Sequence, residues 1–128
     1  MFHDHIYFLV LPTVAPEVKQ TSGPRLIKSV GEDEVKLQCN VKYAQTYTWF
    51  KNGARISSIL PKRYTVKQFR YLQITNVMKS DSGLFVCVAK NNIGRVNCTI
   101  NFLVEGMDFV LFLDSTFDIV AISFFNSL

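Results

Sequence analysis

The stretch Asp81–Cys87, DSGLFVC, continues through VAK into NNIG, which ends at Gly94. Alternate positions place Phe85, Cys87 and Ala89 on one side of an extended chain. Such period-two alternation is typical of a half-buried strand, and an Asn- and Gly-rich tetrapeptide is typical of a turn. The stretch therefore predicts a strand with Cys87 on its buried side.

Working outward, the same signal recurs on both sides of this strand. Further strands are predicted in RLIKS, VKLQCN, TYTWFK, YTVK, LQIT and RVNCTINFLVE. Asn52-Gly53 follows the aromatic strand and predicts a tight hairpin, since both residues tolerate positive φ. Short strands at this spacing, without a convincing helix, predict an all-β antiparallel sandwich.

The charge is unevenly distributed along the 128 residues. All 14 Lys and Arg lie between Lys19 and Arg95, so residues 16–106 carry 14 basic against six acidic groups, a net charge of +8, while the whole chain has +4. A basic body predicts an anionic partner, such as a sulfated polysaccharide, an acidic protein or a nucleic acid, or else a well-solvated surface. No RNA-reading motif is present, so we expect no nucleic-acid partner.

The two ends of the chain differ from the body. Residues 1–15 contain an apolar run that predicts a linker or a weak signal-like segment. Residues 107–128 are apolar but contain three aspartates, each of which would cost about 2.5–3.5 kcal/mol near a bilayer centre. We therefore expect non-domain extensions at both ends and a poorly ordered tail without an assigned role.

Motifs of catalysis are missing from the sequence. It contains no nucleophile elbow, P-loop or HExxH helix, and His3 with His5 makes only a weak two-ligand set. We expect no enzyme, no cofactor and no metal. Cys39, Cys87 and Cys98 have no CxxC spacing, and in an oxidising compartment they predict one disulfide with one cysteine left over.

Specific motifs extend this pattern over residues 16–106. WFKNG, LQITNV, DSGLFVC and AKNNIG resemble intermediate-set immunoglobulin domains. The resemblance implies a Cys39–Cys87 disulfide between facing sheets with Trp49 packed against it, the alternative being reduced buried thiols. It also implies a structural ion pair between Asp81 and a basic residue on a neighbouring strand, for which Arg63 is the candidate.

Within this set, APE, RLI, VKLQC, YTVK and GRVNCT are most similar to an extracellular domain of fibroblast growth factor receptors and their receptor-like relatives. That family's domain binds growth factor and heparan sulfate. The resemblance implies heparan-binding roles for Arg25, Lys28, Lys36 and Lys67. Acidic residues at 32–34 lie beside this basic strip.

Asn97-Cys98-Thr99 is an N-glycosylation triplet on the last predicted strand. Alternation places Asn97 outward and Cys98 inward, so Asn97 is predicted to carry a glycan. Cys98 is then interpreted as a small buried hydrophobe, with a reactive or intermolecular thiol as the alternative.

These observations predict an extracellular recognition module of a cell-surface receptor or adhesion protein, in a parent protein attached to the membrane. Its partners would be a protein ligand, a growth factor or heparan sulfate. The alternative is a cytoplasmic cytoskeletal or sarcomeric scaffold domain of the same fold. The glycosylation triplet and the cysteine pattern favour the first hypothesis.

Overall fold

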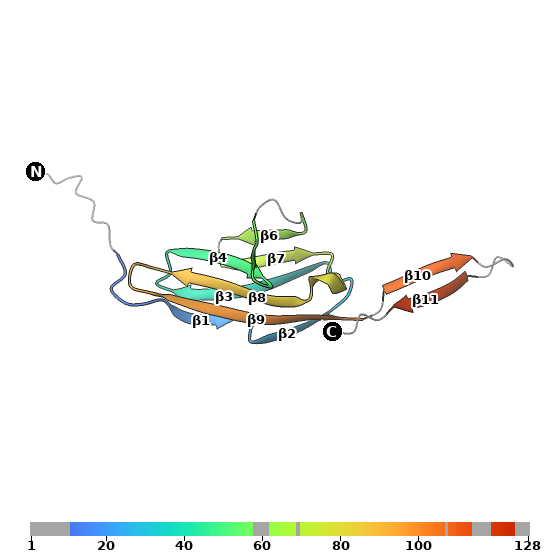
Figure 1. Cartoon of the computed structure of the whole chain (residues 1–128), viewed down its shortest axis with the longest axis horizontal. Coiled ribbons are helices and arrows are strands. Elements are labelled where there is room, and N and C mark those ends of the chain that lie inside the picture. Colours follow the sequence, from blue (N-terminus) through green and yellow to red (C-terminus); the bar gives the residue numbers. More distant parts are fainter. Residues whose placement is uncertain (1–10, 58–61, 69, 107, 114–118, 125–128) are drawn as a thin grey trace, which may run out of the picture.

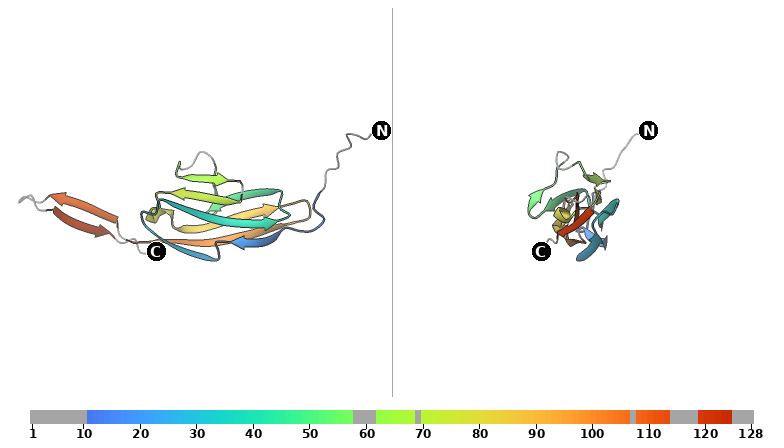
Figure 2. Two further views of the ribbon diagram at one scale, coloured as in Figure 1. Left: turned by 180° about the vertical axis from the view of Figure 1, so that it is seen from behind. Right: turned by 90° about the vertical axis from the view of Figure 1, so that its right-hand side faces the viewer.

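The computed structural model describes residues 11–57, 62–68, 70–106, 108–113 and 119–124. Two sheets pack face to face, and a separate hairpin lies beyond the end of the last long strand (Figures 1 and 2). The predicted all-β sandwich is confirmed.

The first sheet has four strands in the order β1-β3-β7-β6, and every neighbouring pair is antiparallel. Its strands are β1 (Glu17–Thr21), β3 (Glu34–Lys42), β7 (Tyr71–Thr75) and β6 (Tyr64–Lys67). The β1 strand was not predicted, because Val18 is its single partly buried apolar residue and the remaining positions are polar and exposed.

The second sheet has five strands in the order β2-β9-β8-β4-β5. Its strands are β2 (Arg25–Ser29), β9 (Arg95–Glu105), β8 (Gly83–Lys90), β4 (Thr46–Lys51) and β5 (Ala54–Arg55). Asn52 and Gly53 join β4 to β5 with φ of 48° and 84°, which confirms the predicted hairpin.

One pairing departs from the antiparallel prediction. The β2 strand runs parallel to β9, with Ile27 opposite Leu103. The chain crosses from β1 in one sheet to β2 in the other through Ser22–Pro24 without turning back, so β2 keeps the direction of β1 and lies parallel to β9 (Figure 1). Gly23 lies so close to the Thr99 carbonyl that a Cβ at this position would collide with it.

The core fills the space between the two sheets. It consists of alternate residues of β3, β4, β7, β8 and β9, and the largest fully buried side chains are Trp49, Phe85, Phe102, Leu37, Leu72, Ile74 and Ile100. Phe85 packs edge-on against Phe102, with 6.0 Å between ring centroids. The predicted inward side of β8 is confirmed, because Phe85, Cys87 and Ala89 are fully buried.

A short 3₁₀ helix, η1 (Lys79–Asp81), connects the two sheets before β8. Beyond the sandwich, within residues 107–128, β10 (Asp108–Leu113) pairs with β11 (Ile119–Phe124) along six residues. Both segments are rich in β-branched and aromatic residues, which favour strands. Within the described ranges, no helix is long and apolar enough to span a membrane.

Candidate functional site

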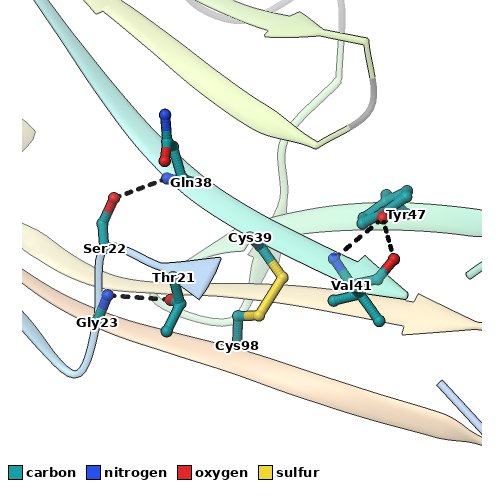
Figure 3. The surroundings of a disulfide bond; sticks show 8 residues. All are labelled: Thr21, Ser22, Gly23, Gln38, Cys39, Val41, Tyr47 and Cys98. Atoms are coloured by element: carbon teal, nitrogen blue, oxygen red, sulfur yellow. Dashed lines mark hydrogen bonds between the residues drawn. A yellow bond between two sulfur atoms is a disulfide. The ribbon is translucent and has the colours of Figure 1, made fainter. Parts of the chain in front are cut away.

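The disulfide joins the two sheets through a different pair of cysteines from the one predicted. Cys39 of β3 is bonded to Cys98 of β9, with 5.9 Å between their Cα atoms (Figure 3). The predicted Cys39–Cys87 bridge is therefore corrected, and so is the interpretation of Cys98 as a small buried hydrophobe. The physical reason is that Cys87 and Cys98 lie directly opposite each other on β8 and β9 and point into the same core. Strand alternation alone cannot choose between them.

Cys87 has the role that was predicted for Cys98, that of a small buried residue outside the disulfide. It is a free, fully buried thiol, and burial raises its pKa to about 12. Its neighbour across the β4–β8 pair is Trp49, which is 2% exposed, so the predicted core tryptophan is confirmed. A thiol in this environment remains protonated near neutral pH and contributes to packing.

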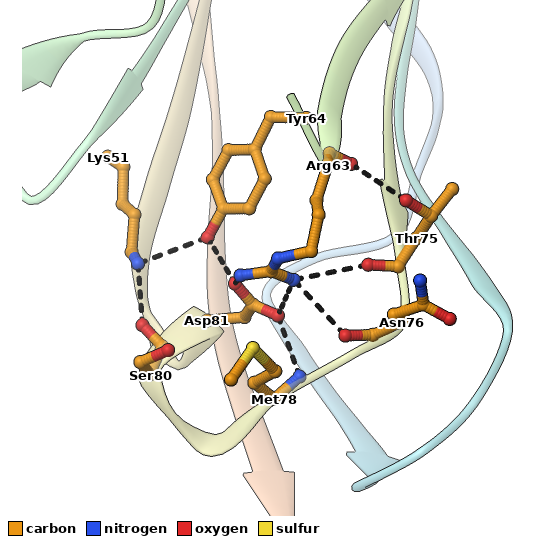
Figure 4. Close-up of polar contacts among 8 residues, drawn as sticks. All are labelled: Lys51, Arg63, Tyr64, Thr75, Asn76, Met78, Ser80 and Asp81. Atoms are coloured by element: carbon orange, nitrogen blue, oxygen red, sulfur yellow. Dashed lines mark hydrogen bonds and ion pairs between the residues drawn. The ribbon is translucent and has the colours of Figure 1, made fainter. Parts of the chain in front are cut away.

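Asp81 is the most deeply buried charged residue among those described, at 1% exposure. Arg63 contacts its two carboxylate oxygens with Nη1 and Nη2 at 2.8 and 2.9 Å (Figure 4). The predicted ion pair is confirmed. The same carboxylate also accepts hydrogen bonds from the Tyr64 hydroxyl at 2.7 Å and the Met78 backbone N–H at 2.7 Å.

These contacts shift the protonation of the groups around Asp81. Burial alone would raise the pKa of Asp81, but the hydrogen bonds from Arg63, Met78 and Tyr64 outweigh it and lower the pKa below its ordinary value. The pKa of Tyr64 is raised by burial and by its hydrogen bond to Asp81. Lys51 completes the cluster by donating to the Tyr64 hydroxyl at 3.1 Å and to the Ser80 carbonyl at 2.7 Å. The cluster links β6 to the segment before β8 and is structural.

The outer face of the four-stranded sheet is polar. Its exposed side chains include Lys36 on β3 and Lys67 on β6, so two of the four predicted heparan-binding residues share this face. The Lys36 ammonium lies 3.7 Å from Glu34 and 5.2 Å from the centre of the Tyr71 ring. Arg25 and Lys28 lie on β2 of the other sheet, so the structure does not bring the four residues onto one surface.

The outer face of the five-stranded sheet contains a feature that the sequence analysis missed. Six apolar side chains point away from the core across β2, β9, β8 and β4. Five of them form what we call the outer apolar patch: Ile27, Phe50, Leu84, Val86 and Leu103; the sixth, Val88, extends it along β8. Ile27 and Leu84 are each 45% exposed. The available signal was the run LFVCV in β8, which is apolar on both sides of the strand.

Asn97 lies on this same outer face, nearer the other end of β9. It is exposed and opposite Val88, and Thr99 of the triplet is exposed as well. The side chain of Asn97 therefore has the outward orientation that a glycan requires, while its neighbour Cys98 points inward into the disulfide.

Metal chemistry has no counterpart in the described part of the chain. Among those residues, no group of three or more His, Cys, Asp or Glu side chains is placed to hold a metal ion. His3 and His5, the weak two-ligand set of the sequence, lie outside the described residues.

With this geometry established, comparison with known proteins gives the family. Residues 16–91 match the family model described as an immunoglobulin domain. The chain belongs to the immunoglobulin domain family. This immunoglobulin domain is 30% identical to human contactin-4 over 108 residues, covering 83% of the chain and 10% of contactin-4. It is 32% identical to human hemicentin-1 over 90 residues, covering 69% of the chain and 2% of hemicentin-1.

Solved structures agree with this assignment. Immunoglobulin domains 1–4 of Sidekick-1 superpose with a TM-score of 0.66 at 25% identity, covering 72% of the chain and 24% of that structure. The titin M3 domain superposes with a TM-score of 0.60 at 22% identity, covering 73% of the chain and all of that structure, which shows the shared fold alone. The domain resembles those of cell-adhesion proteins, and it spans a small part of the relatives that it matches.

Proposed function

We propose that this immunoglobulin domain is an extracellular recognition module of a cell-surface or adhesion protein, acting by binding and not by catalysis. The likeness to contactin-4 and hemicentin-1, which are extracellular adhesion proteins, supports this role. The parent protein would be attached to the membrane, and the partner would be a protein.

One triplet carries the proposal. Asn97 points outward as a glycan acceptor, and the next residue, Cys98, points inward to the disulfide with Cys39. Both features belong to the oxidising secretory route, where disulfides form and Asn-x-Thr triplets are modified. A cytoplasmic scaffold domain would need neither feature.

The test is to express the full chain in mammalian cells behind a secretion signal. We expect a secreted product whose electrophoretic mobility increases on treatment with peptide N-glycosidase, and an Asn97→Gln variant that shows no such increase. The alternative of a sarcomeric or cytoskeletal scaffold predicts a different result. In that case the domain would not depend on its disulfide and would be equally stable after reduction.

Binding of heparan sulfate is a second candidate function, consistent with the growth-factor-receptor resemblance of the sequence. The observation that favours it is the placement of Lys36 and Lys67 on one polar sheet face in a body of net charge +8. Glu34 beside Lys36 reduces the local charge, and Arg25 with Lys28 lies on the other sheet. In the growth-factor-receptor family that the sequence resembles, the domain that binds heparan sulfate also binds growth factor. Growth-factor binding would therefore accompany heparan binding here.

Heparin chromatography tests this second candidate. We expect the chain to bind immobilised heparin. The Lys36→Ala/Lys67→Ala variant should elute at lower salt, because each cation that is lost weakens the electrostatic binding that salt screens. Lys90→Ala/Arg95→Ala is a charge-matched control on the opposite sheet. Equal elution of the two double variants would show that retention depends on net charge and not on a site.

A further inference from the structure

We infer that the outer apolar patch binds a second copy of this chain, in a two-fold contact centred on Ile27 and Leu103. These two side chains are direct partners on β2 and β9 and point away from the core (Figures 1 and 2 show the two strands side by side). Leu84 adjoins them on β8, opposite Asn101. Contiguous apolar patches exposed on a protein surface often mark sites of contact with a partner.

Two opposite charges, one on each side of the Ile27–Leu103 pair, indicate that the partner is a second copy of the chain. Arg25 lies two residues before Ile27, and Glu105 lies two residues after Leu103, so each is about 7 Å from the central pair on opposite sides. Arg25 and Glu105 are both exposed, and neither has an ion-pair partner within the described residues.

A two-fold axis across the strands at Leu103 reverses the strand direction of one copy relative to the other. It therefore brings Arg25 of each copy toward Glu105 of its mate, forming two equivalent ion pairs. A closed two-fold contact requires this kind of self-complementary surface. The apolar centre and its two opposite charges satisfy that requirement.

The other described charges of this face are Arg55, Lys90 and Arg95, and all three lie away from the Ile27–Leu103 centre. Arg55 is opposite Phe50, at the β4 edge of the patch. Lys90 and Arg95 form a cross-strand pair eight residues along β9 from Leu103, or about 27 Å away. Asn97 is six residues from Leu103, about 20 Å from the centre of the contact, and it lies opposite Val88 beside the far end of the patch. A shallow depression lined by Arg25, Gly83, Asn101 and Leu103 adjoins the centre and can receive a side chain of the second copy.

The size of the patch makes the association weak. A stable interface buries about 800 Å² on each partner, and five partly exposed side chains provide less than that. We therefore expect a dissociation constant of about 0.1–1 mM in solution. Display of many copies on facing surfaces would strengthen such a contact by avidity.

Sedimentation equilibrium of the full secreted chain, from about 10 µM to about 1 mM, tests the inference around the expected dissociation constant. Wild-type chain is expected to dimerise, and Ile27→Asp to remain monomeric over the whole range. Ile93→Asp is the matched control, because Ile93 is 53% exposed but lies in the β8–β9 turn. It is expected to dimerise as the wild type does.

Charge reversal provides the second arm. Arg25→Glu or Glu105→Arg alone is expected to weaken dimerisation about tenfold, since two exposed ion pairs are lost and like charges take their place. The double variant Arg25→Glu/Glu105→Arg restores the pairs and is expected to recover the wild-type constant. A monomeric wild type, a dimer that survives Ile27→Asp, or a double variant without recovery would overturn the inference.

The inference rests on the proposed function only in placing the copies outside the cell, and the two can fail separately. A monomeric chain that is glycosylated at Asn97 overturns the self-association and leaves the extracellular role intact. A chain that dimerises through Ile27 but is never glycosylated supports the self-association and overturns the extracellular role.

Discussion

The outer faces of the two sheets differ although their inner faces are equally apolar. On the four-stranded sheet the outward residues are polar, among them Lys36, Gln38, Asn40, Thr65, Lys67 and Gln73. On the five-stranded sheet the outward positions include Ile27, Phe50, Leu84, Val86 and Leu103. Both faces are open to solvent in the isolated chain.

The contrast separates what the fold needs from what recognition needs. An antiparallel sheet with one buried face requires apolar residues on alternate positions only, as β3 shows. The β8 strand is apolar at the additional positions Leu84, Val86 and Val88, which contribute little to the core. We attribute these extra apolar residues to the proposed contact with a second copy, and the polar four-stranded face to solvation.

The largest expected effect comes from breaking the link between the two sheets. Cys39→Ser removes the disulfide to Cys98, which closes a chain segment of 59 residues. In the chain-entropy model this lowers the free energy of unfolding by about 4 kcal/mol. Denaturant unfolding with tryptophan fluorescence measures the loss, since Trp49 is the single tryptophan.

Cys87→Ala is the control for this experiment, because it removes a buried thiol without removing the Cys39–Cys98 bond. We expect a loss of about 1 kcal/mol from the small cavity. A loss as large as that of Cys39→Ser would mean that Cys87, and not Cys98, is bonded to Cys39.

The second effect concerns the Asp81 cluster, which ties β6 of one sheet to the segment before β8 of the other. Asp81→Ala removes the acceptor of the Tyr64 hydroxyl and the negative partner of the Arg63 charge, and we expect a loss of about 3 kcal/mol. Glu34→Ala removes the exposed pair with Lys36 and is expected to cost less than about 0.5 kcal/mol. Similar losses in the two variants, measured by urea unfolding, would contradict the assignment of Asp81 as the buried anchor.

The pH dependence of stability follows from the same carboxylate. The pKa of Asp81 is lower in the folded chain than its ordinary value of 3.8. Its stabilising contribution is therefore complete above pH 3.8 and is lost as the pH falls through the lower, folded value. We expect wild-type stability to fall more steeply below pH 4 than that of Asp81→Asn. Parallel curves for the two proteins would contradict this.

The smallest effect on stability, and the one that sharpens the comparison most, is expected on the outer apolar patch. Leu84→Asp changes an exposed residue, so the free energy of unfolding should stay within about 0.5 kcal/mol of wild type. The same change at Leu37, on the inner side of β3, should prevent folding. A large destabilisation by Leu84→Asp, measured by thermal unfolding, would show that Leu84 serves the core and not a partner.

Most of the fold could be predicted from the sequence because period-two alternation fixes which face of each strand is buried. The burial of Phe85 and Cys87 followed from that rule. The Asn52-Gly53 hairpin followed from turn chemistry, and the burial of Trp49 from the resemblance to the family. The parallel β2–β9 pair could not be predicted, because strand direction depends on where the chain crosses between sheets.

The candidate site was less predictable for two physical reasons. Cys87 and Cys98 are cross-strand neighbours on one buried face, so alternation assigns them equal access to Cys39. The outer apolar patch combines residues of four strands, and its members become neighbours only through the sheet order. By contrast, the Arg63–Asp81 pair was correctly predicted from the resemblance to the family.

Peptide mapping of the secreted full chain by mass spectrometry tests the central claim most directly, because one peptide contains Asn97, Cys98 and Thr99. The extracellular assignment and the structure together predict a glycan on Asn97, a bond from Cys98 to Cys39 and an unmodified thiol at Cys87. An unmodified Asn97 in a chain whose Cys39 is bonded to Cys87, or is reduced, would contradict both.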